Sequence, residues 1–163
     1  QYGKGDPELN KLMESFMNIA SAKVSTSAKE AAEMGYITKK DKQTTNRKNL
    51  LKDAKNTVLN MLSYGYVKPT INKKIKVHGR SALAMFNAGV ETMKQGKYIS
   101  EYDQKLAQKL AYIMCGGDLT QECFVEEQYL LDLEREAFVS LCGEQKTLER
   151  MHSILFKRKP LRN

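Results

Sequence analysis

The end of the chain holds the side chains best suited to bind a ligand. Lys157, Arg158 and Lys159 follow Phe156 and precede Pro160. Ammonium and guanidinium groups form charge-assisted hydrogen bonds with phosphate. The spacing therefore fits a phosphate-bearing ligand, while a run of cations is also typical of an ordinary solvated terminus.

The remaining titratable side chains do not form a recognisable catalytic or metal-binding pattern. His78 stands before a glycine and His152 lies inside the last helical segment, and neither has Asp or Cys at a diagnostic spacing. Glu134 and Glu136 are two positions apart, so a helix places them on different faces. We therefore predict packing or surface roles for both histidines, and neither a catalytic residue nor a metal site in this chain.

The cysteines indicate the redox compartment. Cys115, Cys123 and Cys142 are odd in number and lack the paired spacing of a metal site. This usage predicts reduced thiols that pack as small apolar groups, and therefore a cytoplasmic protein.

The composition is that of a soluble globular protein. The chain has 163 residues, of which 41% are hydrophobic and 28% are charged, enough for one core of ordinary size. It lacks a run of about eighteen apolar residues, and it lacks the charged and apolar regions of a secretory signal. We therefore predict one domain without a membrane span.

The formal net charge is +8, which raises the question of an anionic partner. The cations are spread along the chain, and the stretch from Glu122 to Glu136 is acidic. The sequence lacks zinc-finger spacing, a P-loop and the aromatic motif of RNA-binding domains. A solvated basic surface accounts for this distribution without nucleic acid, and a basic nucleic-acid-binding module stays open as an alternative.

Hydrophobic periodicity predicts the elements that carry these residues. Apolar side chains recur at three- and four-residue spacing in segments separated by glycine or polar loops. The predicted helical segments are Pro7–Ala22, Ser27–Gly35, Leu50–Gly65, Ser81–Gln95, Glu101–Met114, Leu133–Leu141 and Leu148–Leu155. Alternating apolar residues and lysines predict a short edge strand within Pro69–Val77. The expected fold class is mainly α, a helical domain of about six to seven helices with at most one short edge strand.

Polar caps and glycines predict where these helices begin and end. Asp6, Ser27 and Ser100 are the predicted N-caps, and Glu30 would complete a capping box with Ser27. Gly143 is expected to adopt the left-handed conformation that commonly ends a helix. The other glycines predicted to stop a helix are Gly35, Gly65 and Gly96.

Several stretches resemble the C-terminal part of the crotonase (enoyl-CoA hydratase/isomerase) superfamily. The general likeness is carried by the Ala-rich segment Ala22–Ile37 and by a Glu-x-x-x-Phe element that precedes the basic Lys-Arg-Lys-Pro end. One branch is closer, namely the bifunctional 3-hydroxyacyl-CoA dehydrogenase/enoyl-CoA hydratase of bacterial fatty-acid β-oxidation. That branch is indicated by Tyr98–Asp103, Gly116-Gly117-Asp118 and Tyr129–Phe138.

The resemblance implies that the chain is the C-terminal piece of a larger enzyme that acts on acyl-CoA, with NAD as the cofactor of its dehydrogenase half. The dinucleotide-binding half and the hydratase carboxylates would precede Gln1, so this piece would hold no cofactor and would be inactive alone. The absence of an initiator Met supports the same expectation. The likeness divides the single domain 1–163 into a junction at 1–37, a branch-specific insertion at 98–127 and a terminal helical pair at 128–163.

The resemblance also implies one binding site. Phe138 and Lys157 match family positions that help to enclose the 3′-phosphate-adenosine end of coenzyme A, although Phe156 stands where many relatives have Glu. In the family the end helices also pack against a neighbouring subunit. We therefore expect a homo-oligomer in which this segment covers acyl-CoA. An autonomous helical oligomerisation module without a ligand stays open beside the nucleic-acid-binding alternative.

Overall fold

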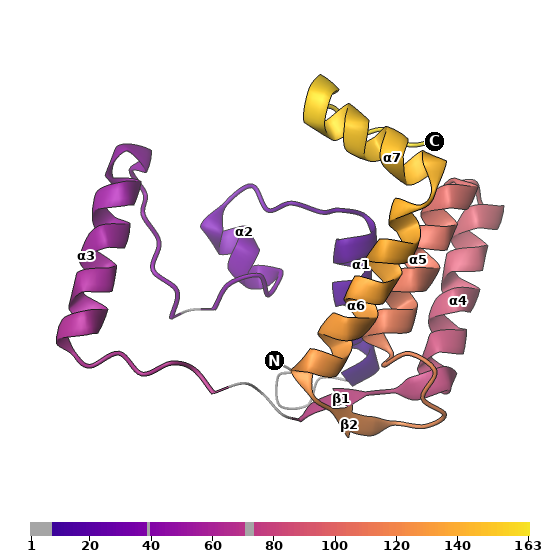
Figure 1. Ribbon diagram of the computed structural model, residues 1–163, viewed down its shortest axis with the longest axis horizontal. Helices are drawn as coiled ribbons and strands as arrows, with labels where there is room; N and C mark the ends of the chain where they lie inside the picture. The colour runs from indigo at the N-terminus through magenta and orange to yellow at the C-terminus, as the bar shows by residue number, and fades with distance from the viewer. Residues whose placement is uncertain (1–7, 39, 71–73) are drawn as a thin grey trace. The chain divides into compact units, whose positions relative to one another are not determined.

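A computed structural model describes residues 8–38, 40–70 and 74–163 of the chain (Figure 1). These residues form two compact units, and each is described by itself. The larger unit joins residues 8–22 to residues 74–163, and the smaller unit holds residues 23–38 and 40–70.

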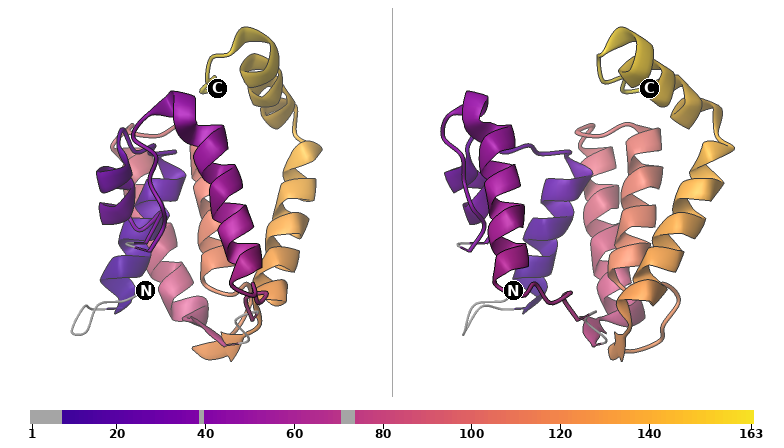
Figure 2. Two further views of the ribbon diagram at one scale, coloured as in Figure 1. Left: turned by 90° about the vertical axis from the view of Figure 1, so that its left-hand side faces the viewer. Right: turned by 60° about the vertical axis from the view of Figure 1, so that its left-hand side comes forward.

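The larger unit is a helical bundle with a short two-stranded sheet at one end. Its helix α5 contacts three others, namely α4, α1 and α6 (Figures 1 and 2). The elements in chain order are α1 (Glu8–Ala20), β1 (Ile75–Val77), α4 (Gly79–Gln95), α5 (Glu101–Met114), β2 (Cys123–Val125), α6 (Glu127–Cys142), α7 (Gln145–His152) and the π-helical turn η2 (Ser153–Lys157).

The core of this unit lies where α1, α4 and α5 meet. Helix α5 and its C-cap present Ala107, Ala111 and Cys115 at a spacing of four residues, which aligns them along one face. Because these side chains are small, the rings of Phe16 and Phe86 fit against them, with centroids 4.8 Å apart. All five side chains are buried, so α5 supplies the surface on which its neighbours pack.

The two-stranded sheet pairs β1 with β2 in antiparallel register, with Ile75 opposite Val125 and Val77 opposite Cys123. The strand expected within Pro69–Val77 is confirmed at 75–77, and residues 71–73 lie outside the described residues. The second strand was not predicted, because a three-residue run beside acidic residues carries little periodicity. On β1, the Nζ atom of Lys76 pairs with the carboxylates of Glu8 and Glu122, at 2.9 and 3.2 Å.

Two glycines allow the two-stranded sheet to lie close to the bundle. Gly116 has φ +88°, and a Cβ atom there would lie 2.6 Å from Cγ2 of the buried Val77. Gly79 has φ +64°, and its Cβ would lie 2.8 Å from the carbonyl oxygens of Leu119 and Gln121. Only glycine fits both the conformation and the space at these positions.

The smaller unit contains α2 (Ala28–Glu33), the 3₁₀ turn η1 (Arg47–Asn49) and α3 (Leu50–Ser63). Ser27 caps α2 as predicted, because its side chain accepts a hydrogen bond from the Glu30 N–H at 3.1 Å. The capping box is displaced by one residue, since the Glu30 carboxylate accepts from the backbone N–H of Thr26 instead of Ser27. Helix α3 contains no buried residue.

The predicted helix ends are largely confirmed, with one correction. Ser100 and Asp103 form a full capping box at the start of α5, and Gly35 and Gly65 both have positive φ. Gly143 was predicted to be left-handed and is not, because its φ is −78°. The chain there continues through a right-handed turn into α7. Asp6 and Pro7 lie outside the described residues.

The fold class is confirmed as mainly α, with seven α-helices and one two-stranded sheet in the described ranges. The apolar residues expected to define the last helical segment do not form a buried stripe. Those with large exposed areas are Leu148, Met151, Ile154 and Leu155. Of the helices in residues 8–38, 40–70 and 74–163, none combines the length and apolar character needed to cross a membrane.

Replacing Gly116 with alanine tests the close packing of the two-stranded sheet against the bundle. The left-handed conformation and the clash with Val77 should lower the free energy of unfolding by at least about 2 kcal/mol. Gly89→Ala is the matched control, because Gly89 lies in α4 with nothing within 4 Å of its Cβ position. It should raise stability by about 0.5–1 kcal/mol. Equal effects of both changes in urea unfolding would contradict this explanation.

Candidate functional site

The C-terminal segment is fastened to the start of α5 by Arg150. Its Nη1 lies 2.7 Å from Oδ1 of Asp103, and both side chains are mostly buried, at 16% and 21% exposed. Its Nε and Nη2 donate to the side-chain and backbone oxygens of Asn163, at 2.8 and 3.2 Å. The Ser100 hydroxyl donates to the same backbone oxygen at 3.2 Å. We call these four residues the Arg150 clamp.

The Tyr102 ring packs against Arg150 of the clamp. Its buried ring lies 5.1 Å from the guanidinium carbon of Arg150 and 5.7 Å from Nζ of Lys146, which are cation–π distances. Its hydroxyl forms a short hydrogen bond with the hydroxyl of Thr147. Helix α7 is therefore held to α5 by charged, aromatic and hydroxyl contacts.

The clamp sets the ionisation of Asp103. Burial acts to raise the pKa of this carboxyl group, but hydrogen bonds from Arg150 and Ser100 act more strongly in the opposite direction. The pKa of Asp103 is therefore held below its ordinary value, and the carboxylate stays charged through the neutral range.

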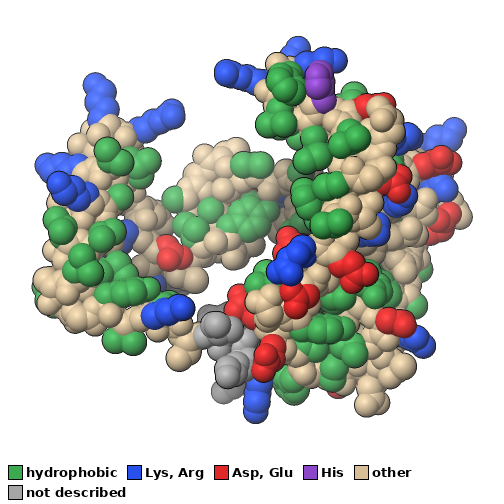
Figure 3. Space-filling model, viewed as in Figure 1, with side chains coloured by type: hydrophobic (Ala, Val, Ile, Leu, Met, Phe, Trp, Pro, Cys, Tyr) green, Lys and Arg blue, Asp and Glu red, His purple; other side chains and the backbone are tan. Residues whose placement is uncertain are grey.

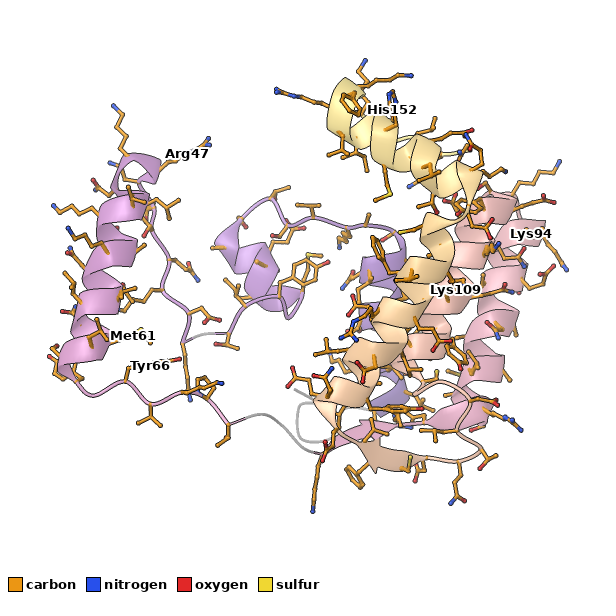
Figure 4. The ribbon with its side chains drawn as sticks, in the orientation of Figure 1. Arg47, Met61, Tyr66, Lys94, Lys109 and His152 are labelled. Atoms are coloured by element: carbon orange, nitrogen blue, oxygen red, sulfur yellow. The ribbon has the colours of Figure 1, made fainter. Side chains whose placement is uncertain are left out.

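Lys157, one of the two expected coenzyme A contacts, lines a shallow cavity of about 370 Å³ on the α7 side of the larger unit. His152 and Glu149 line it too, and Figure 4 shows His152 near the end of α7. The cavity therefore mixes a cation with a carboxylate. The remaining lining residues are Gln145, Leu148, Ser153 and Leu161.

Phe138 is not among the residues that line this cavity. It lies on the outer face of α6 and is 55% exposed. Phe156, which precedes Lys157 in the sequence, is 74% exposed, and its ring packs against that of His152 with centroids 4.7 Å apart. Coenzyme A contacts by Phe138 and Lys157 remain a prediction.

A second cavity, of about 470 Å³, lies along the groove between α5 and α6. Lys105, Lys109 and Tyr112 line one side, and Glu136 lines the other (Figure 4 labels Lys109). Lys105 already forms an ion pair with Glu144. Because the groove contains both signs of charge, it does not select an anionic ligand by itself.

His78, for which the sequence predicts a packing or surface role, lies inside the larger unit. It is buried at the start of α4, with Nδ1 3.7 Å from a carboxylate oxygen of Glu122. Its Nε2 is enclosed and accepts or donates no hydrogen bond among the described residues. Other atoms of His78 line a cavity of about 450 Å³ with Ser81 and Glu122, so the packing role rests on the burial of Nε2.

All three cysteines are free thiols. Cys115 is fully buried, and burial raises the pKa of its thiol to about 11. Cys123 and Cys142 are half-buried. Within the described ranges, His, Cys, Asp and Glu form no group of three or more that could hold a metal ion.

The glycine pair Gly116-Gly117 does not fit an NAD site. A dinucleotide-binding turn leads from a strand into a helix, whereas this pair follows helix α5. A Cβ at Gly117 would lie 3.2 Å from the Leu133 side chain, and the Tyr129 hydroxyl donates to the Gly116 carbonyl at 3.0 Å. These glycines therefore serve the packing of α6 against the end of α5.

Comparison with known proteins gives one informative similarity. The chain is 44% identical over 160 residues to the probable 3-hydroxyacyl-CoA dehydrogenase of Bacillus subtilis (strain 168). This match covers 98% of the chain but 20% of the relative, so the chain spans about a fifth of that protein's length. Neither a family model nor a solved structure matches the chain. The similarity agrees with the dehydrogenase part of the expected resemblance, and the relative's name mentions no hydratase.

Replacing Arg150 with methionine tests the clamp. At neutral pH the change should lower the free energy of unfolding by about 2 kcal/mol, because it removes charge-assisted hydrogen bonds from a mostly buried carboxylate. Arg135→Met is the control, since Arg135 pairs with Asp132 in solvent. It should change stability by less than about 0.5 kcal/mol.

The same pair of variants gives a pH test. Since the folded-state pKa of Asp103 is lowered, its contribution is present above its unfolded pKa and is lost as the pH falls through the folded value. The stability difference between wild type and Arg150→Met, measured by urea unfolding, should therefore shrink from pH 6 to pH 3. A difference that is constant over this range would contradict the role given to Asp103.

Thiol labelling tests the environment of the cysteines. At pH 8 iodoacetamide should modify Cys123 and Cys142 in the folded protein and leave Cys115 intact until urea is added, because its thiol is inaccessible and protonated. Peptide mass spectrometry identifies the modified sites. Labelling of Cys115 at the rate of the other two would show that α5 is not packed as described.

Proposed function

We propose that this chain is a segment of a 3-hydroxyacyl-CoA dehydrogenase of fatty-acid oxidation. The observation that carries the proposal is the 44% identity to a relative of that name over nearly the whole chain. The larger unit buries its apolar residues more completely than the smaller unit does. This difference fits a segment that completes its packing within a longer protein. We call that longer protein the parent.

The oxidation itself is assigned to other parts of the parent. The glycine pair of this chain follows a helix and does not fit a dinucleotide site, and the Nε2 atom of His78 is buried. We therefore assign NAD binding and proton removal to residues of the parent outside this chain. The isolated chain is expected to be inactive.

Within the parent, this segment would help to cover acyl-CoA and to assemble subunits. Lys157 follows the exposed Phe156 in the sequence, and Arg158 and Lys159 add two more cations. Such a surface can hold the phosphates of coenzyme A. Exposed apolar residues of α7 and η2, including Leu155, offer area for contact with a second subunit of the parent.

A hydratase activity of the parent rests on the sequence resemblance alone. A cytoplasmic location rests on cysteine usage alone. Addition of water to a trans-2-enoyl-CoA by the parent would support the hydratase. A parent that oxidises 3-hydroxyacyl-CoA but leaves the enoyl-CoA unchanged would restrict the function to the dehydrogenase.

Calorimetric titration of acyl-CoA into the parent tests the covering role. Lys157→Gln should weaken binding by roughly two- to tenfold, because it removes one partly screened contact to phosphate. Lys29→Gln is the matched control, since Lys29 is an exposed cation of α2. Phe138→Ala tests the other expected contact. Unchanged affinity in both Lys157→Gln and Phe138→Ala would refute a role in covering acyl-CoA.

A further inference from the structure

Helix α3 carries an apolar face that nothing in its own unit covers. Leu51, Val58 and Leu62 recur at helical spacing and are 85%, 55% and 65% exposed. Leu50 and Met61 lie on the same side and are also exposed. The opposite side is polar and carries Lys52, Asn56, Asn60 and Ser63. Figure 3 shows hydrophobic side chains gathered over α3, and Figure 4 labels Met61 near its end.

The contacts that α3 does make use its polar side. Asp53 accepts a hydrogen bond from Thr44 at 3.1 Å, and Thr57 bonds back to the carbonyl of Asp53 at 2.8 Å. Both side chains are half-buried, unlike the leucines of the apolar face. The preceding loop therefore positions α3 with its apolar face turned outward.

A helix of this kind needs a partner. An isolated helix of fourteen residues is marginal in water, and most helical stability in proteins comes from packing an apolar face. The smaller unit that carries this face is basic, with seven cations and two carboxylates between residues 40 and 68. The partner surface should therefore be an apolar groove bordered by carboxylates.

We propose that the apolar face of α3 docks onto a part of the parent dehydrogenase outside this chain. The inference rests on the proposed function. Four-fifths of the Bacillus subtilis relative lie beyond its match with this chain, and α3 lies within the match, which covers 98% of the chain. A partner surface on the same polypeptide is therefore available.

The tether favours this occupant over a second copy of the chain. A surface on the same polypeptide meets α3 at a high effective concentration, so a single helix face can dock there at protein concentrations at which separate molecules dissociate.

Hydrogen exchange of the α3 amides tests the proposal. The 163-residue chain and the parent, each purified at low micromolar concentration, are compared by mass spectrometry. Amides of α3 should exchange at least about tenfold more slowly in the parent. In the parent, Leu51→Asp with Val58→Asp should restore fast exchange, because two carboxylates enter an apolar contact. Asn56→Asp with Asn60→Asp adds the same charge to the polar side and should leave the protection intact.

Four results would overturn the proposal. The first is slow exchange of the α3 amides in the isolated chain, and the second is protection of these amides that grows with the concentration of that chain. The third is protection of the isolated chain by added vesicles of anionic phosphatidylglycerol, and the fourth is fast exchange of the α3 amides in the parent. A parent that oxidises 3-hydroxyacyl-CoA while α3 exchanges fast refutes the docking alone. A gene that encodes no dehydrogenase around this chain refutes both the docking and the proposed function.

Discussion

The larger unit depends on the carboxylate of Asp103. One of its oxygens accepts from the backbone N–H of Ser100 and completes the cap of α5, while the other receives the guanidinium of Arg150. The same group therefore starts the central helix and fastens the C-terminal segment to it. Since α1, α4 and α6 all pack against α5, the position of that helix decides the geometry of the whole unit.

The two units differ in how much apolar surface each buries within itself. The larger unit has a core in which small residues of α5 receive aromatic rings from α1 and α4. The smaller unit has local caps and loop contacts, but its main helix leaves its leucines in solvent. A chain with one self-sufficient unit and one incomplete unit is what a segment of a larger enzyme should look like. The identity to part of a 3-hydroxyacyl-CoA dehydrogenase gives the same picture from sequence.

Local features could be predicted from the sequence, and long-range contacts could not. The caps of Ser27 and Ser100 and the ends at Gly35 and Gly65 follow from the chemistry of neighbouring residues. The Arg150–Asp103 pair joins positions 47 apart, so no local spacing indicates it. The strand β2 was missed for the same reason, because it exists through pairing with a distant strand. The conformation of Gly143 depends on the helix that follows it.

The same limit on prediction from sequence applies to the candidate site. The cations at Lys157–Lys159 are visible in the sequence, but the exposure of Phe156 and its contact with His152 depend on the fold. The central claim is that this chain belongs to a dehydrogenase whose chemistry lies elsewhere in the polypeptide. Its most direct test is NADH formation from a 3-hydroxyacyl-CoA by the purified parent and by the isolated chain. The account predicts turnover by the parent alone, and turnover by the isolated chain, or none by the parent, would contradict it.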